Sequence, residues 1–181
     1  MTSKKIRSIT YCGLFIALIA VCSWISIPAT VPFTLQTFGV FAAVGILGGK
    51  LGTIAVTGYV ILGAIGVPVF AGFSGGMGAI AGTSGGYIIG FIFTALTMWL
   101  FEKLLGKKFW VLILSMVIGL IVCYAFGTVW FMIVYTNNTG AVGLGTVLGW
   151  CVTPFLIPDA VKIVCATIIT NRVKKLQVVK L

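Results

Sequence analysis

Long apolar stretches alternate along the chain with short interruptions that are charged or rich in glycine and proline. The apolar stretches cover about residues 9–27, 38–48, 53–66, 87–105, 109–135 and 158–171. A perpendicular membrane crossing needs about 20 apolar residues. The segments 38–48 and 53–66 are shorter, so they either gain residues from their flanking loops or stop short of the far surface. The pattern predicts an all-α integral membrane protein with six transmembrane helices in a single membrane domain, residues 1–181.

The composition agrees with a lipid bilayer as the natural solvent. Of the 181 residues, 60% are hydrophobic and 8% are charged, and the mean hydropathy is +1.23, whereas a soluble domain carries about 25% charged residues. The basic segment before residue 9 also resembles the start of a signal peptide. Because no small-residue cleavage site and soluble domain follow it, we expect a retained first span.

The charges predict the orientation of the chain. Basic residues lie at both termini and in the turns at 48–52 and 102–108, while the loops 28–36, 67–86 and 136–140 carry no charge. Positive charge marks the cytoplasmic side of membrane proteins, so both termini are expected in the cytoplasm and the uncharged loops outside. The net charge of +10 could suggest nucleic acid. Since the basic residues flank the spans and form no single face, no nucleic-acid partner is expected.

The sequence lacks the residues of an enzyme. It has no histidine and no pair of acidic residues close in sequence, its five cysteines form no CxxC pair, and no nucleotide-binding loop is present. We therefore expect no catalysis, no ATPase activity within this polypeptide, no metal site and no cofactor. The remaining classes are a solute-binding membrane protein, a channel and a structural subunit.

One charged pair stands inside apolar sequence. Asp159 is one of only two acidic residues, and Lys162 follows three positions later, so both lie on one face of a helix. Pro158 suits a first helical turn, which places Asp159 beside the partially positive helix N-terminus, towards the outer side. Charges within membrane segments usually face a cavity or a partner. The pair therefore either serves a ligand site or only locks helices together.

Two glycine patterns add candidates. The segment 67–86 is uncharged, apolar and rich in glycine, so it is expected to fold back onto the protein and to let its backbone approach a ligand closely. In the first span, Gly13 and Ala17 form a small-xxx-small step, which Ala20 extends. Such a step lets another helix approach closely, and packing within the protein explains it as well as a partner does.

Four motifs give the chain a resemblance to a known family. They are 31–37 (VPFTLQT), 63–76 (GAIGVPVFAGFSGG), 85–91 (GGYIIGF) and 154–162 (PFLIPDAVK), in that order and over nearly the whole chain. Together they resemble the biotin-specific S components of energy-coupling factor transporters. S components are small membrane proteins that bind a vitamin near the outer surface of the prokaryotic cell membrane. They associate with a transmembrane coupling subunit and two ABC-type ATPases.

The resemblance also implies roles for particular residues. Asp159 would accept hydrogen bonds from the ureido ring of biotin, while Lys162 would either pair with Asp159 or act on the valerate carboxylate. The first helix, with Gly13, Ala17 and Ala20, would dock on the coupling subunit. The implied substrate-binding residues are Gln36, Phe73, Gly75, Gly76, Gly85, Gly86, Tyr87, Asp159 and Lys162. The alternative is a structural or channel-type subunit in which Asp159 and Lys162 only lock helices.

Overall fold

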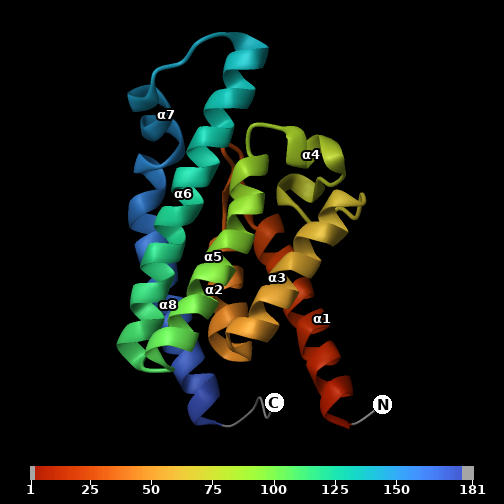
Figure 1. Cartoon of the computed structure of the whole chain (residues 1–181). Helices are drawn as coiled ribbons and strands as arrows, with labels where there is room; N and C mark the ends of the chain where they lie inside the picture. Colours follow the sequence, from red (N-terminus) through yellow and green to blue (C-terminus); the bar gives the residue numbers. More distant parts are fainter. Residues whose placement is uncertain (1–2, 177–181) are drawn as a thin grey trace.

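A computed structural model describes residues 3–176; residues 1–2 and 177–181, which include both predicted cytoplasmic ends and Lys180, lie outside it. The described chain is almost entirely helical (Figure 1). Its elements are α1 (Ser3–Trp24), β1 (Ser26–Ile27), β2 (Phe33–Thr34), α2 (Gln36–Leu47), α3 (Gly49–Ala64), the 3₁₀ turn η1 (Ala71–Phe73), α4 (Met77–Ala81), α5 (Gly85–Leu105), α6 (Phe109–Thr139), α7 (Leu144–Cys151), the 3₁₀ turn η2 (Thr153–Phe155) and α8 (Leu156–Lys175).

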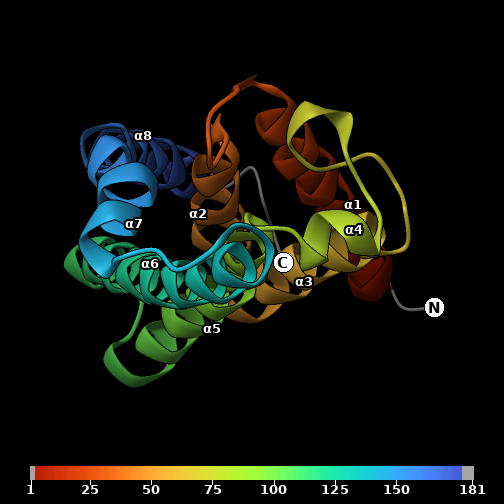
Figure 2. The ribbon, with the colours of Figure 1, turned by 90° about the horizontal axis from the view of Figure 1, so that it is seen from above.

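Helix α2 is the centre of the bundle. It packs against α8, α3, α1 and α5, and nearly all of its residues are buried. Seen from above, α1 and α8 lie on opposite sides of it (Figure 2). Helices α5 and α6 form the most extensive helix pair, joined by a short connection at 106–108. The small antiparallel hairpin of β1 and β2 connects α1 to α2.

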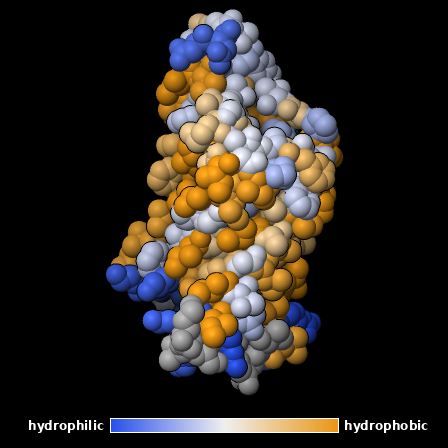
Figure 3. Space-filling view, turned by 90° about the vertical axis from the view of Figure 1, so that its right-hand side faces the viewer, coloured by the Kyte–Doolittle hydropathy of each residue, from blue (hydrophilic) through white to orange (hydrophobic). Residues whose placement is uncertain are grey.

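Within residues 3–176, four segments are long and apolar enough to cross a membrane. They are Lys4–Trp24, Gly85–Leu105, Phe109–Thr139 and Leu144–Lys175, the last of which combines α7 with α8. Helices α2 and α3 are apolar but shorter. In the space-filling view, the most hydrophilic surface gathers at the lower end and at the top, with mostly apolar or pale surface between them (Figure 3).

The predicted turn over 48–52 is wrong, because the break between α2 and α3 is only one residue long. Gly48 has a φ of +82°, a conformation that favours glycine. The backbone N–H of Gly49 then donates to Oε2 of Glu102 at 2.6 Å, which satisfies one of the free donors at the start of α3. Lys50 consequently lies in the first turn of α3.

Three other boundaries differ from the prediction. Helix α1 ends at Trp24, so residues 26–27 lie in β1 and not in the first helix. The predicted polar loop at 136–140 is helical up to Thr139, and α6 ends at Gly140, which has a φ of +123°. The segment 143–153 forms the separate short helix α7, and α8 starts at Leu156 with Pro158 in its first turn.

Candidate functional site

A cavity with about 770 Å³ of empty space, open mouth included, lies between α2, α5, α6, α8 and the two loops that join α1 to α2 and α3 to α5. Its lining combines an apolar wall with a few placed polar groups, as is typical of small-molecule sites. The lining residues are Val31, Pro32, Thr34, Gln36, Thr37, Phe70, Ala71, Ser74, Ala79, Ser84, Tyr87, Ile88, Phe91, Leu120, Cys123, Tyr124, Cys151, Phe155, Asp159 and Lys162.

Asp159 and Lys162 form the charged part of this lining. Both are buried, with 2% and 5% of their surfaces exposed. The ammonium group of Lys162 donates to Oδ1 of Asp159 at 2.7 Å. Asp159 lies in the first turn of α8, where the partial positive charge of the helix N-terminus stabilises a carboxylate. The cavity therefore contains a compact ion pair held by one helical turn.

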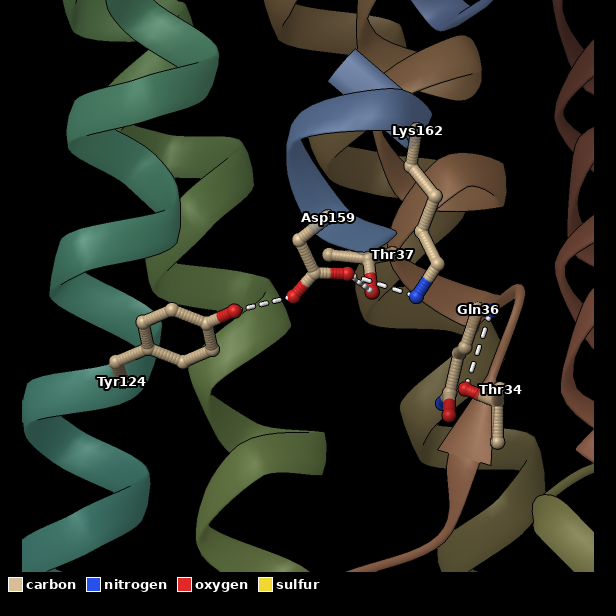
Figure 4. A network of polar contacts seen from close by, with 6 residues as sticks. All are labelled: Thr34, Gln36, Thr37, Tyr124, Asp159 and Lys162. Atoms are coloured by element: carbon tan, nitrogen blue, oxygen red, sulfur yellow. Dashed lines mark hydrogen bonds and ion pairs between the residues drawn. The ribbon is translucent and has the colours of Figure 1, made fainter. Parts of the chain in front are cut away.

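Two other helices bring hydroxyl groups to the same carboxylate (Figure 4). Thr37 of α2 donates from Oγ1 to Oδ1 of Asp159 at 3.4 Å. Tyr124 of α6 donates its phenolic O–H to Oδ2. Asp159 thus has donors from three helices, which fixes its position at the point where α2, α6 and α8 meet. A buried charge needs such compensation because it has lost its water.

The segment around β2 supplies a second polar group. The Gln36 amide nitrogen donates to the Tyr59 hydroxyl at 2.7 Å, and that hydroxyl donates to the Val69 carbonyl at 3.0 Å. These bonds connect the start of α2 to α3 and to the loop after it. The amide oxygen of Gln36 is left without a partner among residues 3–176, on a side chain that lines the cavity. It is therefore available to a donor on a ligand.

Aromatic rings flank the pair. The Lys162 ammonium lies 4.7 Å from the centroid of the Phe33 ring, within the range of a cation–π contact. Phe33 in turn stacks on Phe155 of η2, with centroids 5.4 Å apart. Tyr87 reaches the cavity from the first turn of α5, and its hydroxyl lies 3.3 Å from that of Thr128. Aromatic rings therefore lie directly beside the charged groups of the site.

Four of the nine residues expected to bind substrate line the cavity together: Gln36, Tyr87, Asp159 and Lys162. The other five, Phe73, Gly75, Gly76, Gly85 and Gly86, are not among the lining residues. Phe73 is 63% exposed and stacks on Trp24 at the end of α1, with centroids 4.9 Å apart. Its backbone has a φ of +56°, which is uncommon for a residue with a side chain.

Three of the four glycines permit close approach, and the fourth, Gly76, permits a backbone conformation that favours glycine. A Cβ added at Gly75 would lie 2.4 Å from the Val67 carbonyl oxygen, and one at Gly85 would overlap the backbone of Ile80. A Cβ at Gly86 would lie 2.2 Å from the Trp130 side chain. Gly76 has a φ of +89°, and its N–H donates to the Gly63 carbonyl at 2.7 Å. Each of the four therefore positions a loop or a helix near the cavity.

Sequence reasoning missed Tyr124 and Thr37 as partners of Asp159. Tyr124 is a hydroxyl-bearing ring in the middle of the long apolar stretch that forms α6, and this was the only signal for it. Thr37 directly follows Gln36 at the start of α2. Neither is close to Asp159 in sequence, so only the fold brings them together.

On α1 the three small residues do not share one environment. Gly13 and Ala17 are exposed, and a Cβ added at Gly13 would meet nothing within 4 Å. Ala20 is buried at 4% exposure, in the core of the bundle. Larger apolar residues on the same exposed face, such as Leu14, Val21 and Trp24, surround the gap that Gly13 and Ala17 leave.

The model of the BioY family matches residues 1–178. This chain belongs to the BioY family. The family resemblance inferred from the four motifs is thereby confirmed. With its long apolar helices, this BioY chain is a multi-pass protein of a prokaryotic cell membrane.

Individual relatives agree over almost the full length. The biotin transporter BioY of Thermotoga maritima is 43% identical over 173 residues, covering 95% of this chain and 98% of the relative. The probable biotin transporter BioY of Pyrococcus horikoshii is 40% identical over 171 residues, covering 94% and 98%. A crystal structure of the S-component for biotin from an ECF-type ABC transporter superposes with a TM-score of 0.84 at 29% identity, covering 97% of this chain and 95% of that one.

Proposed function

We propose that this BioY chain is the biotin-binding membrane subunit of an energy-coupling factor transporter. In this role it binds biotin with high affinity and delivers it inward, driven by a separate coupling module. The observation that carries the proposal is the buried Asp159–Lys162 pair, which lines an apolar cavity in a chain of this family.

The chemistry of the cavity suits the two ends of biotin. A carboxylate offers about four acceptor positions, and three of those on Asp159 are taken by Lys162, Thr37 and Tyr124. One position remains for an N–H of the ureido ring, and the Gln36 amide oxygen offers another acceptor. The Lys162 ammonium has donors beyond the one used by Asp159, which suit the ureido carbonyl or the valerate carboxylate. Apolar and aromatic walls suit the thiophane ring and the alkyl chain.

The proposed topology has six spans: α1, α2, α3, α5, α6 and α8. Every described Lys and Arg except Lys162 lies near the start of α1, the α2–α3 and α5–α6 connections or the end of α8, all at the lower end in Figure 1. By the positive-inside rule this end faces the cytoplasm. The cavity mouth and the uncharged loops then face outward. A single membrane domain with both termini inside follows from this arrangement.

The proposed partners are a transmembrane coupling subunit and two ABC-type ATPases, with no enzymatic activity in this chain itself. The exposed Gly13 and Ala17 on α1 form the docking surface.

Gly13→Leu should leave biotin binding unchanged, because a side chain there meets nothing within the chain, yet abolish uptake in cells that contain the coupling module. The matched control is Gly13→Ala, which keeps the position small and should retain uptake. Normal uptake by Gly13→Leu contradicts this docking surface.

One observation favours a different function, that of a structural or channel-type subunit. Asp159 and Lys162 satisfy each other and have further partners in Thr37, Tyr124 and Phe33 without any ligand. A pair of this kind can lock helices by itself. Under this alternative, exchanging the two charges preserves activity, and no vitamin raises the thermal stability.

Biotin titration of the purified protein distinguishes the proposed biotin-binding function from the structural or channel-type alternative. The wild-type protein should bind biotin with a submicromolar Kd and unfold at a higher temperature in its presence. Asp159→Asn should bind about 100-fold more weakly, since it removes one partner of a buried charge pair. The same change leaves Lys162 buried and unpaired, which itself destabilises the protein.

A double variant controls for that loss of stability. Asp159→Asn with Lys162→Met removes both charges together and should fold, because no unpaired charge remains buried. It should still fail to bind biotin submicromolarly. Wild-type affinity in this folded double variant, or no binding by the parent protein, would falsify the proposed site.

A further inference from the structure

A second cavity lies at the basic end of the bundle, away from the Asp159 site. It is a shallow, open site between the ends of α2, α5, α6 and α8, with about 320 Å³ of empty space when the solvent at its mouth is included. Lysines from two places line it: Lys107 and Lys108 from the α5–α6 connection, and Lys174 from the last turn of α8. Glu102 of α5 and Ser115 of α6 complete its polar lining. Apolar residues of α2, α5 and α6 and Gly106 form the rest.

The charges around this cavity do not balance. Glu102 supplies its carboxylate, but Oε2 already accepts from the Gly49 N–H at 2.6 Å and Oε1 lies 3.3 Å from the Lys107 ammonium. The chain has only two acidic residues, and the other one, Asp159, is buried beside Lys162. Among the described residues, the single carboxylate of Glu102 thus faces three lysines around this cavity, so its lining carries an excess of positive charge. An anionic ligand would offset this excess.

The surface beside the cavity indicates what kind of anion this is. Leu104 and Leu105 at the end of α5 and Phe109 and Trp110 at the start of α6 flank the lysines, and all four are exposed, Trp110 by 76%. A free inorganic anion leaves this apolar surface without a contact. A lipid places its phosphate among the lysines and its acyl chains along the apolar residues. Tryptophan at this depth is typical of the lipid interface.

We propose that this cavity binds the phosphate headgroup of an anionic membrane lipid through Lys107, Lys108 and Lys174. Basic cavities between helices on the cytoplasmic side are a recurrent form of lipid headgroup site. The phosphate contacts lysines of both the α5–α6 connection and the end of α8. It thereby reduces the repulsion between these neighbouring positive segments. The site is independent of the proposed biotin cavity and shares no lining residue with it.

Native mass spectrometry of the full-length protein in detergent tests the proposal. The protein is titrated with phosphatidylglycerol and with phosphatidylcholine of identical acyl chains. Phosphatidylglycerol should bind with about tenfold preference or more, and Lys108→Gln with Lys174→Gln should weaken it about 30-fold, as expected for two lysines near an anionic headgroup. The control is Lys5→Gln with Lys50→Gln, which removes the same charge outside the cavity and should change binding less than twofold.

A charge-preserving variant, a folding control and a competition with inorganic phosphate complete the test. Lys108→Arg with Lys174→Arg keeps both charges and should retain phosphatidylglycerol binding, and the Gln variant should still bind biotin, which shows that it is folded. Equal binding of the two lipids, or equal losses in the Gln variant and its control, overturns the proposal. Inorganic phosphate that displaces phosphatidylglycerol at millimolar concentration also overturns it, since the site then recognises a soluble anion.

Discussion

At the level of single residues, the Asp159 carboxylate depends on donors from three helices. Lys162 comes from its own helix, Thr37 from α2 and Tyr124 from α6. Of these, only Tyr124 reaches Oδ2. The orientation of the carboxylate in the cavity therefore depends on one phenol, which makes Tyr124 a positioning residue for Asp159.

Tyr124→Phe is expected to weaken biotin binding about tenfold and to lower the free energy of unfolding by about 1.5–3 kcal/mol, the value of a hydrogen bond to a charged group. The ring and its packing are retained, so the effect isolates the hydroxyl. Calorimetric titration with biotin and thermal unfolding measure the two quantities.

The matched control for this change is Tyr135→Phe on the same helix. Tyr135 stacks on Phe131, packs at a tilt against Trp150 and does not line the cavity, so its hydroxyl should be dispensable for biotin. Equal affinity losses in the two variants would mean that the Tyr124 hydroxyl does not act through Asp159.

The sequence was sufficient to predict Asp159 and Lys162 as a pair, and not sufficient for their partners. Two charged residues three positions apart in an apolar helix can be recognised from the sequence alone, since they lie on the same helix face. Tyr124 lies 35 residues and Thr37 lies 122 residues from Asp159. Contacts at such separations depend on how helices cross, which hydrophobic periodicity does not determine.

At the level of elements, glycine determines how closely helices approach. Along the α5–α6 pair, a Cβ at Gly86 would meet Trp130, one at Gly90 would meet the Cys123 sulfur, and one at Gly127 would meet the Tyr87 ring. Small residues at interfaces are the usual way in which membrane helices pack. The Gly127 contact also holds Tyr87, whose side chain lines the cavity.

Gly86→Ala is expected to destabilise the protein by about 1–3 kcal/mol, because the added methyl group must displace Trp130 in a tightly packed helix pair. Thermal unfolding in detergent measures the loss. Gly145→Ala in α7 is the control: it is also a helical glycine, but its Cβ would meet nothing within 4 Å, so no loss is expected there. Equal stability of the two variants would show that α5 and α6 can separate without cost.

The same glycines show where sequence reasoning about elements stops. A motif rich in glycine predicts close backbone approach, but not whether the approaching group is a ligand, a loop or another helix. At Gly75 it is the Val67 carbonyl, at Gly85 it is the backbone of Ile80, and at Gly86 it is Trp130. The ends of the short helices 36–47 and 49–64 were predicted to within a few residues, because glycines bound the apolar runs that form these helices.

For the whole molecule, the distribution of charge defines two different ends. The lower end in Figure 1 carries almost all basic residues of the described chain, while the loops at the opposite end have none. The side surface between them is largely apolar (Figure 3). Such a distribution favours one orientation in the membrane, with the basic end in the cytoplasm.

Cysteine labelling in intact cells tests this orientation. A cysteine at Asn138, near the end of α6 and exposed, should react with a membrane-impermeant maleimide added outside. A cysteine at the exposed Lys107 should react only after the cells are opened. The parent protein, with its own five cysteines, provides the background. The reverse labelling pattern contradicts the cytoplasmic placement of the basic end.

The contact between Trp24 and Phe73 connects the two proposed binding surfaces of the molecule. Trp24 ends α1, and besides stacking on Phe73 its indole N–H donates to the Pro68 carbonyl at 2.9 Å. Phe73 belongs to the loop that contributes Phe70, Ala71 and Ser74 to the cavity. If a partner docks on α1 and a ligand binds in the cavity as proposed, each contacts a segment that this contact joins, so the two events can affect each other. Thermodynamic linkage makes such an effect reciprocal. If docking of the partner lowers the affinity for biotin by some factor, bound biotin lowers the affinity for the partner by the same factor.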